Sequence, residues 1–235
     1  MIRIMSLVFF CCIGGTGFGQ FLMKAGHTSA DVTFPETEKF KISPVGGSVF
    51  GMGYDIGNDS SRFSFLIETL IIKKGAKDVK DTNGGVGNRR RVTTNTVNIT
   101  YFEVPFLAKY TIGKNNIQFF LNTGFSLAVA MSGKFTSEVA LQDPYPDGPW
   151  TTQSISGKVV FQEDDPKADE LNVDNNTDIV FNLGGGLLLF KRVILDFRYG
   201  LGLKNLYNTG EFYPRNPPSS KNRVMQFSLG YNFGS

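Results

Sequence analysis

Residues 116–131, "NIQFFLNTGFSLAVAM", carry an apolar side chain at almost every second position. This period of two is typical of a β-strand and not of a helix. A strand in a soluble protein usually has about five or six residues, whereas a tilted strand that crosses a bilayer needs roughly nine to eleven. The stretch is therefore long enough to span a membrane as a strand.

The first residues have the form of a secretory signal peptide. A basic start at Arg3 precedes an apolar run and the small-residue segment "GGTGFGQ", which predicts a peptide of residues 1–19 cleaved before Gln20. Both cysteines, Cys11 and Cys12, fall within it, so residues 20–235 are expected to lack disulfides, thiolate metal sites and a cysteine nucleophile. No other apolar run approaches the roughly twenty residues of a membrane helix, so a membrane span in the rest of the chain requires strands.

The same alternation recurs along residues 20–235, which we expect to form one domain. It predicts eight strands, near residues 21–25, 42–54, 63–71, 96–111, 117–131, 179–189, 193–203 and 225–233. Within 96–111 the apolar positions change parity, from Ile99 and Tyr101 to Phe102 and Val104. A β-bulge near Tyr101 and Phe102 would reconcile the two halves.

The predicted connections alternate in length. Those at 29–41, 74–95, 133–177 and 205–222 are long, and those at 55–61, 112–115 and 190–192 are short. Outer-membrane barrels have short periplasmic turns and long extracellular loops. The sequence therefore predicts an all-β fold, an eight-stranded antiparallel transmembrane β-barrel of the OmpA/OmpX up-and-down type, in the outer membrane of a Gram-negative bacterium with both termini periplasmic.

A soluble eight-stranded barrel of the lipocalin type is the main alternative, and it would place the oily face inside. Here charges of both signs share one face with many glycines, while the opposite face carries large Phe, Leu and Tyr side chains. Paired charges suit a narrow interior that side chains fill, which favours a membrane barrel without an open pore. The predicted lumen charge network consists of Glu68, Glu103, Lys109, Asp196 and Arg198. An internal salt-bridge network is the favoured reading, and a gated polar path or proton relay is the alternative.

Four segments resemble the PorT-like outer-membrane β-barrel family (outer membrane protein beta-barrel domain). They are "KAG" at 24–26, "YFEVPFLAKY" at 101–110, "LDFRYGLGLKNL" at 195–206 and "FSLGYNF" at 227–233. The resemblance covers nearly all of residues 20–235 outside the long loops and implies an outer-membrane barrel. One group of this family assists a protein secretion machine, so the resemblance also suggests an accessory role of that kind.

The long loops carry most of the remaining charge. The acidic loop at 133–177 ends in a weak match to a calcium loop at Asp174, Asn176 and Asp178, which lacks the required glycine and closing glutamate. The basic loop is predicted to contact phosphates of the outer-leaflet glycolipid, or else to be a solvated loop. Its cations are Lys74, Lys77, Lys80, Arg89, Arg90 and Arg91.

These features predict a structural or surface-recognition protein that acts through its extracellular loops and is not an enzyme. His27 is the only histidine, and its spacing to Ser29 and Asp31 does not form a catalytic constellation, so no catalytic, cofactor or metal site is predicted. The expected partners are outer-membrane lipid and glycolipid, and the barrel-assembly machinery during insertion. The formal charge of +3 does not suggest nucleic acid, and a monomer is expected. The alternatives are an accessory component of an outer-membrane protein secretion system, with secretion proteins as partners, and a small-solute channel.

Overall fold

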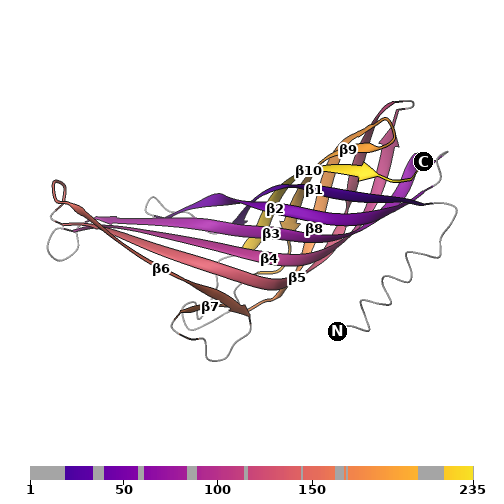
Figure 1. Cartoon of the computed structure of the whole chain (residues 1–235). Helices are drawn as coiled ribbons and strands as arrows, with labels where there is room; N and C mark the ends of the chain where they lie inside the picture. Colours follow the sequence, from indigo (N-terminus) through magenta and orange to yellow (C-terminus); the bar gives the residue numbers. More distant parts are fainter. Residues whose placement is uncertain are drawn as a thin grey trace.

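A computed structural model describes residues 19–33, 40–57, 61–83, 89–113, 116–143, 145–161, 167, 169–205 and 220–234 (Figure 1). The described residues contain no helix that is long and apolar enough to span a membrane. They form ten strands: β1 (Gly19–Thr33), β2 (Phe40–Ile56), β3 (Phe63–Asn83), β4 (Arg90–Ile112), β5 (Ile117–Gln142), β6 (Trp150–Phe161), β7 (Glu170–Val173), β8 (Thr177–Leu189), β9 (Val193–Gly202) and β10 (Lys221–Asn232). Apart from Gly19, the first residue of β1, the predicted signal peptide lies outside the described residues.

Eight of the ten strands close into a ring. The sheet order is β4-β3-β2-β1-β10-β9-β8-β5-β6-β7, and an additional β4–β5 pairing joins its two sides, which leaves β6 and β7 outside the ring. Every pairing within the ring is antiparallel. The predicted eight-stranded antiparallel barrel is confirmed, and the two further strands lie where a long loop was predicted.

The outside of the ring is covered by large apolar side chains. Phe63 and Phe65 on β3, Leu121 on β5 and Phe227 on β10 each expose more than half of their surface. Lipid can cover such a belt, whereas water would make it very costly. On the opposite face β3 buries charged residues, and β5 and β10 bury uncharged polar ones, so the oily side faces outward, as predicted for the membrane barrel and not for the lipocalin alternative.

Three ring strands extend far beyond the belt. The predicted loops at 74–95 and 133–177 are largely strand: β3 runs to Asn83, β4 begins at Arg90, and β5 runs to Gln142 before turning into β6. Together with residues 40–44 of β2, the far ends of β3, β4 and β5 and the added strands β6 and β7 form one sheet, here called the projecting sheet. Figure 1 shows it extending to the left of the ring, away from the C-terminus.

A single extra residue on β5 interrupts the regular ladder between β4 and β5. Thr100 pairs with Ser132 and Tyr101 pairs with Ala130, so Met131 bulges out of the β4–β5 ladder. The bulge predicted near Tyr101 and Phe102 is therefore present in this ladder, between Thr100 and Tyr101, but its extra residue lies on β5. The odd-numbered residues of β4 from 97 to 109 keep facing inward. What changes along β4 is the chemistry of the interior, which is apolar near the projecting sheet and charged further down.

Candidate functional site

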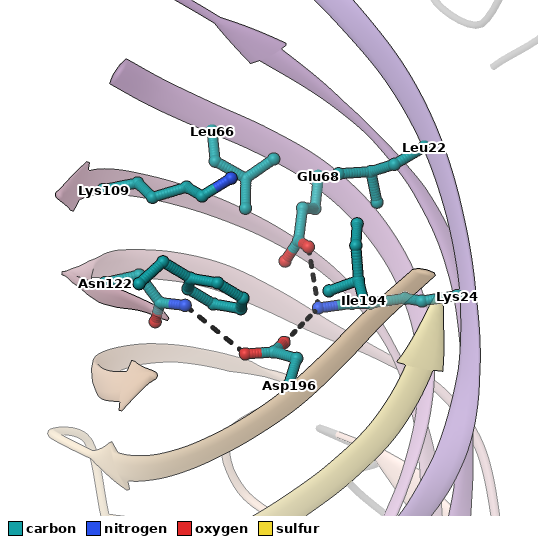
Figure 2. Close-up of a pocket in the computed structure, with 9 residues that line it drawn as sticks. Leu22, Lys24, Leu66, Glu68, Lys109, Asn122, Ile194 and Asp196 are labelled. Atoms are coloured by element: carbon teal, nitrogen blue, oxygen red, sulfur yellow. Dashed lines mark hydrogen bonds and ion pairs between the residues drawn. The ribbon is translucent and has the colours of Figure 1, made fainter. Parts of the chain in front are cut away.

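Four charged side chains from three strands form a closed network in the middle of the lumen. The Lys24 Nζ atom on β1 lies 2.7 Å from Glu68 Oε1 on β3 and 3.0 Å from Asp196 Oδ2 on β9. Arg198, also on β9, contacts the same two carboxylates at 2.6 Å and 3.0 Å. Figure 2 shows Lys24 between Glu68 and Asp196. All four side chains are almost completely buried, and we call them the lumen quartet.

Two further buried ion pairs lie in the lumen. The Lys74 Nζ atom is 2.6 Å from Glu103 Oε2, and the Lys109 Nζ atom is 2.6 Å from Asp55 Oδ2. The five predicted network residues are therefore all buried, but they divide between the quartet and these two pairs. Their remaining partners, Lys24, Lys74 and Asp55, lie outside the predicted network, although the inward parity of Lys24 within β1 is a signal that the sequence does contain.

Apolar layers close the lumen on both sides of the quartet. One layer lies near the short turns and consists of Leu22, Leu66, Leu107, Phe120, Leu188 and Ile194. The other lies where the ring meets the projecting sheet, and there Val159 of β6 and Val173 of β7 pack against the ring residues Leu70, Ile99 and Val180. β6 and β7 therefore help to close the end of the barrel that carries the projecting sheet.

Very little free space remains beside the quartet. The cavity drawn in Figure 2, which Lys24, Glu68, Asn122 and Asp196 help to line, has a volume of about 20 Å³. A second cavity, beside Arg198, has about 10 Å³. One water molecule needs roughly 10 to 15 Å³ of such space, so these cavities have room for single waters and not for a solute.

The predicted glycolipid contacts occupy several different environments. Lys74 does not belong to that surface: its side chain points into the lumen, where Glu103 compensates its charge, because even-numbered residues of this part of β3 face inward. Arg89 is exposed and lies 2.8 Å from Asp143, and Arg90 is bound to Asp81. The others, Lys77, Lys80 and Arg91, are exposed and form no ion pair with a described residue.

Arg90 organises the tip of the projecting sheet. Its guanidinium donates two hydrogen bonds to the Asp81 carboxylate, at 3.2 Å and 2.7 Å, and lies over the rings of Tyr145 and Trp150. The hydrogen bond from Arg90 lowers the pKa of Asp81 below its ordinary value. Burial instead raises the pKa of Asp78 above its ordinary value, although Asn95 donates a hydrogen bond to that carboxylate.

The other residues singled out in the sequence are not brought together into one site. His27 is exposed on the outward face of β1, and Asp31 further along that strand is bound to Arg223 at 2.7 Å. Asp178, from the weak calcium match, is buried and accepts hydrogen bonds from the Lys204 N–H and the Asn222 amide.

The strand β6 has a free edge, which the sequence does not reveal. One edge of β6 pairs with β5 along residues 150–159, and β7 covers the other edge only at residues 158–161. Along residues 150–156, every side chain is exposed and no described strand pairs with the outer edge. This segment, "WTTQSIS", has exposed side chains on both faces and therefore lacks the one-sided burial that made the ring strands recognisable.

Comparisons with solved structures give matches of low sequence identity. Ail, the attachment invasion locus protein of Yersinia pestis, is 10% identical, with 92% of this chain and 100% of Ail covered, at a TM-score of 0.36. Neisserial surface protein A (NspA) is 10% identical, with 90% and 95% covered, at a TM-score of 0.36. The outer membrane enzyme PagL is 12% identical, with 91% and 99% covered, at a TM-score of 0.32. At these values the likenesses carry no conclusion about function, and a search of curated proteins found no match.

The family itself follows from the sequence match. The model of the outer membrane protein beta-barrel domain matches residues 20–208, which include all of the ring strands except β10. The structure supplies the closed ring, the outward apolar belt and the buried charges that such a domain requires. The chain belongs to the outer membrane protein beta-barrel domain family and is an outer-membrane β-barrel.

Proposed function

We propose that this protein is a closed outer-membrane anchor whose projecting sheet binds an extended segment of a protein partner at the cell surface. The free edge of β6 is the observation that carries this proposal. The binding is a recognition function, as the sequence suggests, and it involves no catalytic step.

The lumen supports the anchoring role. Buried ion pairs and two apolar layers fill the barrel, and the cavities beside the quartet have the size of single waters. This packing weighs against the small-solute channel. In planar bilayers the purified protein should give no discrete conductance steps, and regular steps that a quartet variant alters would favour the channel instead.

The direction of the projecting sheet supports a surface role. The short turns and the chain ends of the ring lie at one end of the barrel, and the projecting sheet lies at the other. In barrels of this class the short turns are periplasmic. We therefore place both termini in the periplasm and the projecting sheet outside the cell, which protease cleavage within β6 in intact cells would test.

The free edge of β6 has the properties of a strand that accepts a partner strand. Native proteins usually protect sheet edges with charges, proline, bulges or a covering segment. Residues 150–157 contain no charge and no proline, and the described residues provide no covering strand there. An extended peptide can add to such an edge through main-chain hydrogen bonds, while pockets for alternate side chains provide selectivity.

A second copy of the chain fits this edge less well than a foreign peptide. β6 is antiparallel to β5, a strand that crosses the membrane, so it runs along the membrane normal with some tilt. A symmetric dimer in a membrane has its two-fold axis along that normal, so two copies of β6 would run in the same direction. A foreign peptide has no such constraint and can pair antiparallel.

The experiment uses two adjacent proline variants in the full chain, Gln153→Pro and Ser154→Pro. Alternate N–H groups of a strand point to opposite edges, so one variant loses a bond to β5 and the other loses only the free-edge donor. Hydrogen exchange of the β5 amides shows which variant leaves the sheet intact. Crosslinking mass spectrometry on tagged protein in intact cells then measures the partner. We expect its yield to fall in the free-edge variant, whereas an unchanged yield would overturn the proposal.

The resemblance to the PorT-like group supports a second candidate function, an accessory role in protein secretion. The same crosslinking experiment distinguishes it. Recovery of secretion components, together with a secretion defect on deletion of the gene, would identify that role. An enzymatic role would instead require a hydrolytic activity that a His27→Ala variant loses.

A further inference from the structure

Two lysines of like charge face each other on the projecting sheet. Lys134 on β5 pairs directly with Lys158 on β6, and both side chains are exposed. Opposed residues in an antiparallel pair have Cβ atoms about 4.5 to 5.5 Å apart, and like charges in this arrangement repel each other. Neither lysine forms an ion pair with any residue that the structure describes. An anion that lies between or above them would relieve this repulsion.

Two more lysines flank the same surface on β3. Lys73 and Lys77 are exposed and have the outward parity of Ile71. The strand between the two lysine pairs, β4, contributes only neutral polar side chains here, because Lys73 pairs with Thr100, Lys77 pairs with Thr96, and Asn98 pairs with Lys134. The four lysines thus border a row of hydroxyl and amide groups. We call Lys73, Lys77, Lys134 and Lys158 the lysine face.

A glycine in the middle of this face lets the Asn98 side chain lie close against β3. Gly75 lies between the two β3 lysines and pairs with Asn98. A Cβ atom at Gly75 would lie 3.1 Å from Asn98 Oδ1 and would also collide with the Val97 carbonyl oxygen. The Asn98 amide therefore lies across the space that a larger residue would fill, where it can donate hydrogen bonds to a ligand.

The lysine face lies directly above the apolar belt. Ile71, Phe102 and Val129 are in register on β3, β4 and β5, and all three are exposed. Lys73 follows Ile71 by two residues, which is about 7 Å along a strand. Side chains at this height are level with the lipid headgroups rather than with bulk water, which favours a lipid over a soluble ligand.

Two acidic residues share this face but leave it positively charged. Glu170 on β7 pairs with Lys158 in the sheet. Its carboxylate accepts a hydrogen bond from the backbone N–H of Lys167 and forms no ion pair with Lys158. Glu138 on β5 has the same parity as Lys134 and lies four residues further toward the tip. Four lysines therefore face two carboxylates.

We propose that the lysine face binds the phosphate groups of a phosphorylated lipid in the outer leaflet. Lysine ammonium groups bind phosphate oxygens through charge-assisted hydrogen bonds, and Thr and Asn side chains add neutral donors. A headgroup phosphate over Lys134 and Lys158 removes their mutual repulsion. Of the cations that the sequence suggested for glycolipid, only Lys77 belongs to this face.

The test compares two lipids and two double variants. The full-length protein is purified in detergent, and native mass spectrometry measures binding of a phosphorylated diglucosamine glycolipid and of the same glycolipid without its phosphates. The test variant is Lys134→Gln with Lys158→Gln. The control is Lys80→Gln with Arg91→Gln, which removes the same charge from residues of β3 and β4 whose parity places them on the opposite face of the sheet.

We expect the test variant to bind the phosphorylated lipid about thirtyfold more weakly than wild type at low salt, and the control to bind normally. Heat-modifiable migration on gels confirms that each variant is folded. Equal binding of the two lipids by wild type would overturn the proposal, as would equal loss in both variants. Full competition by millimolar inorganic phosphate would identify a free anion as the ligand and would also overturn it.

Discussion

Removing the Arg198 guanidinium should destabilise the barrel strongly. In wild type, Lys24 and Arg198 balance Glu68 and Asp196 with four contacts of 2.6 to 3.0 Å, all of them buried. The Arg198→Met variant leaves two carboxylates that share one ammonium. Breaking a buried ion pair by removing one partner costs about 3 to 5 kcal/mol. Here one ammonium, that of Lys24, is left to balance two buried carboxylates that water does not reach.

A compensating substitution provides the sharper test. Glu68→Gln alone leaves an excess positive charge and should also be destabilising, but Arg198→Met with Glu68→Gln restores neutrality and keeps the contact of 3.0 Å between Lys24 and Asp196. The double variant should therefore be more stable than the sum of the two single effects predicts, by about 1 to 3 kcal/mol. Arg192→Met, at an exposed position beside a short turn, is the matched control and should change stability by less than about 0.5 kcal/mol.

Denaturant-induced unfolding in lipid vesicles measures these free energies, and heat-modifiable migration confirms the folded state before each titration. Two outcomes would refute the reasoning. The first is an Arg198→Met barrel that unfolds at the same denaturant concentration as wild type. The second is strict additivity in the double variant, which would show that the quartet members do not compensate each other.

Three further predictions concern the backbone and the projecting sheet. In Gly124→Ala the new Cβ would overlap the Phe106 carbonyl oxygen on the neighbouring strand, so heat-modifiable folded protein should be lost, and normal folding would contradict this packing. Deleting Met131 removes the bulge but keeps Ser132 opposite Thr100 and Phe135 opposite Val97, so F135C should react with an impermeant maleimide no faster in the deletion background than in wild type, and faster reaction would contradict this register. Because burial raises the pKa of Asp78, its contribution to stability is present below the ordinary value of 3.8 and is lost as pH rises, so Asp78→Asn should slow hydrogen exchange of residues 76–83 at pH 7 but not in acid. Equal exchange rates at pH 7 would contradict that assignment.

The ring was predictable because its signal is local. Each membrane strand must put apolar residues outward at every second position. A segment such as 117–131 can therefore be recognised as a strand from its own residues, without knowledge of the strands beside it. β6 has no such signal, since both of its faces are exposed, and a strand without a buried face is indistinguishable from a polar loop in the sequence.

The partners within the lumen depend on register between distant strands. Arg198 and Glu68 are 130 positions apart, and nothing local to either residue specifies the other. The environment of Lys74 was also not predictable from nearby residues. In the sequence it lies in a run of basic residues, but β3 continues through this run as a strand and directs the Lys74 side chain inward. Parity predicts which face a charge occupies, whereas its counterion requires the three-dimensional arrangement.

The composition of the lumen quartet has a consequence for how the barrel enters the membrane. Lys24 and Glu68 lie on the N-terminal strands β1 and β3, whereas Asp196 and Arg198 both lie on β9, near the other end of the chain. Each half of the chain therefore carries its own neutral pair before the two halves meet. When β1 pairs with β10, the pairs merge through the contacts of Lys24 with Asp196 and of Arg198 with Glu68.

Neither half needs to carry an unbalanced quartet charge into the bilayer while the seam between β1 and β10 is still open. Closure of that seam adds two ion pairs without any change in net charge. These pairs stabilise the closed barrel, but the earlier steps of insertion do not depend on them. If both positive charges lay on β1 and β3 and both negative charges on β9, each half would carry two unbalanced charges. The distribution of the four charges along the chain thus lowers the free-energy cost of a half-inserted barrel and still favours the closed one.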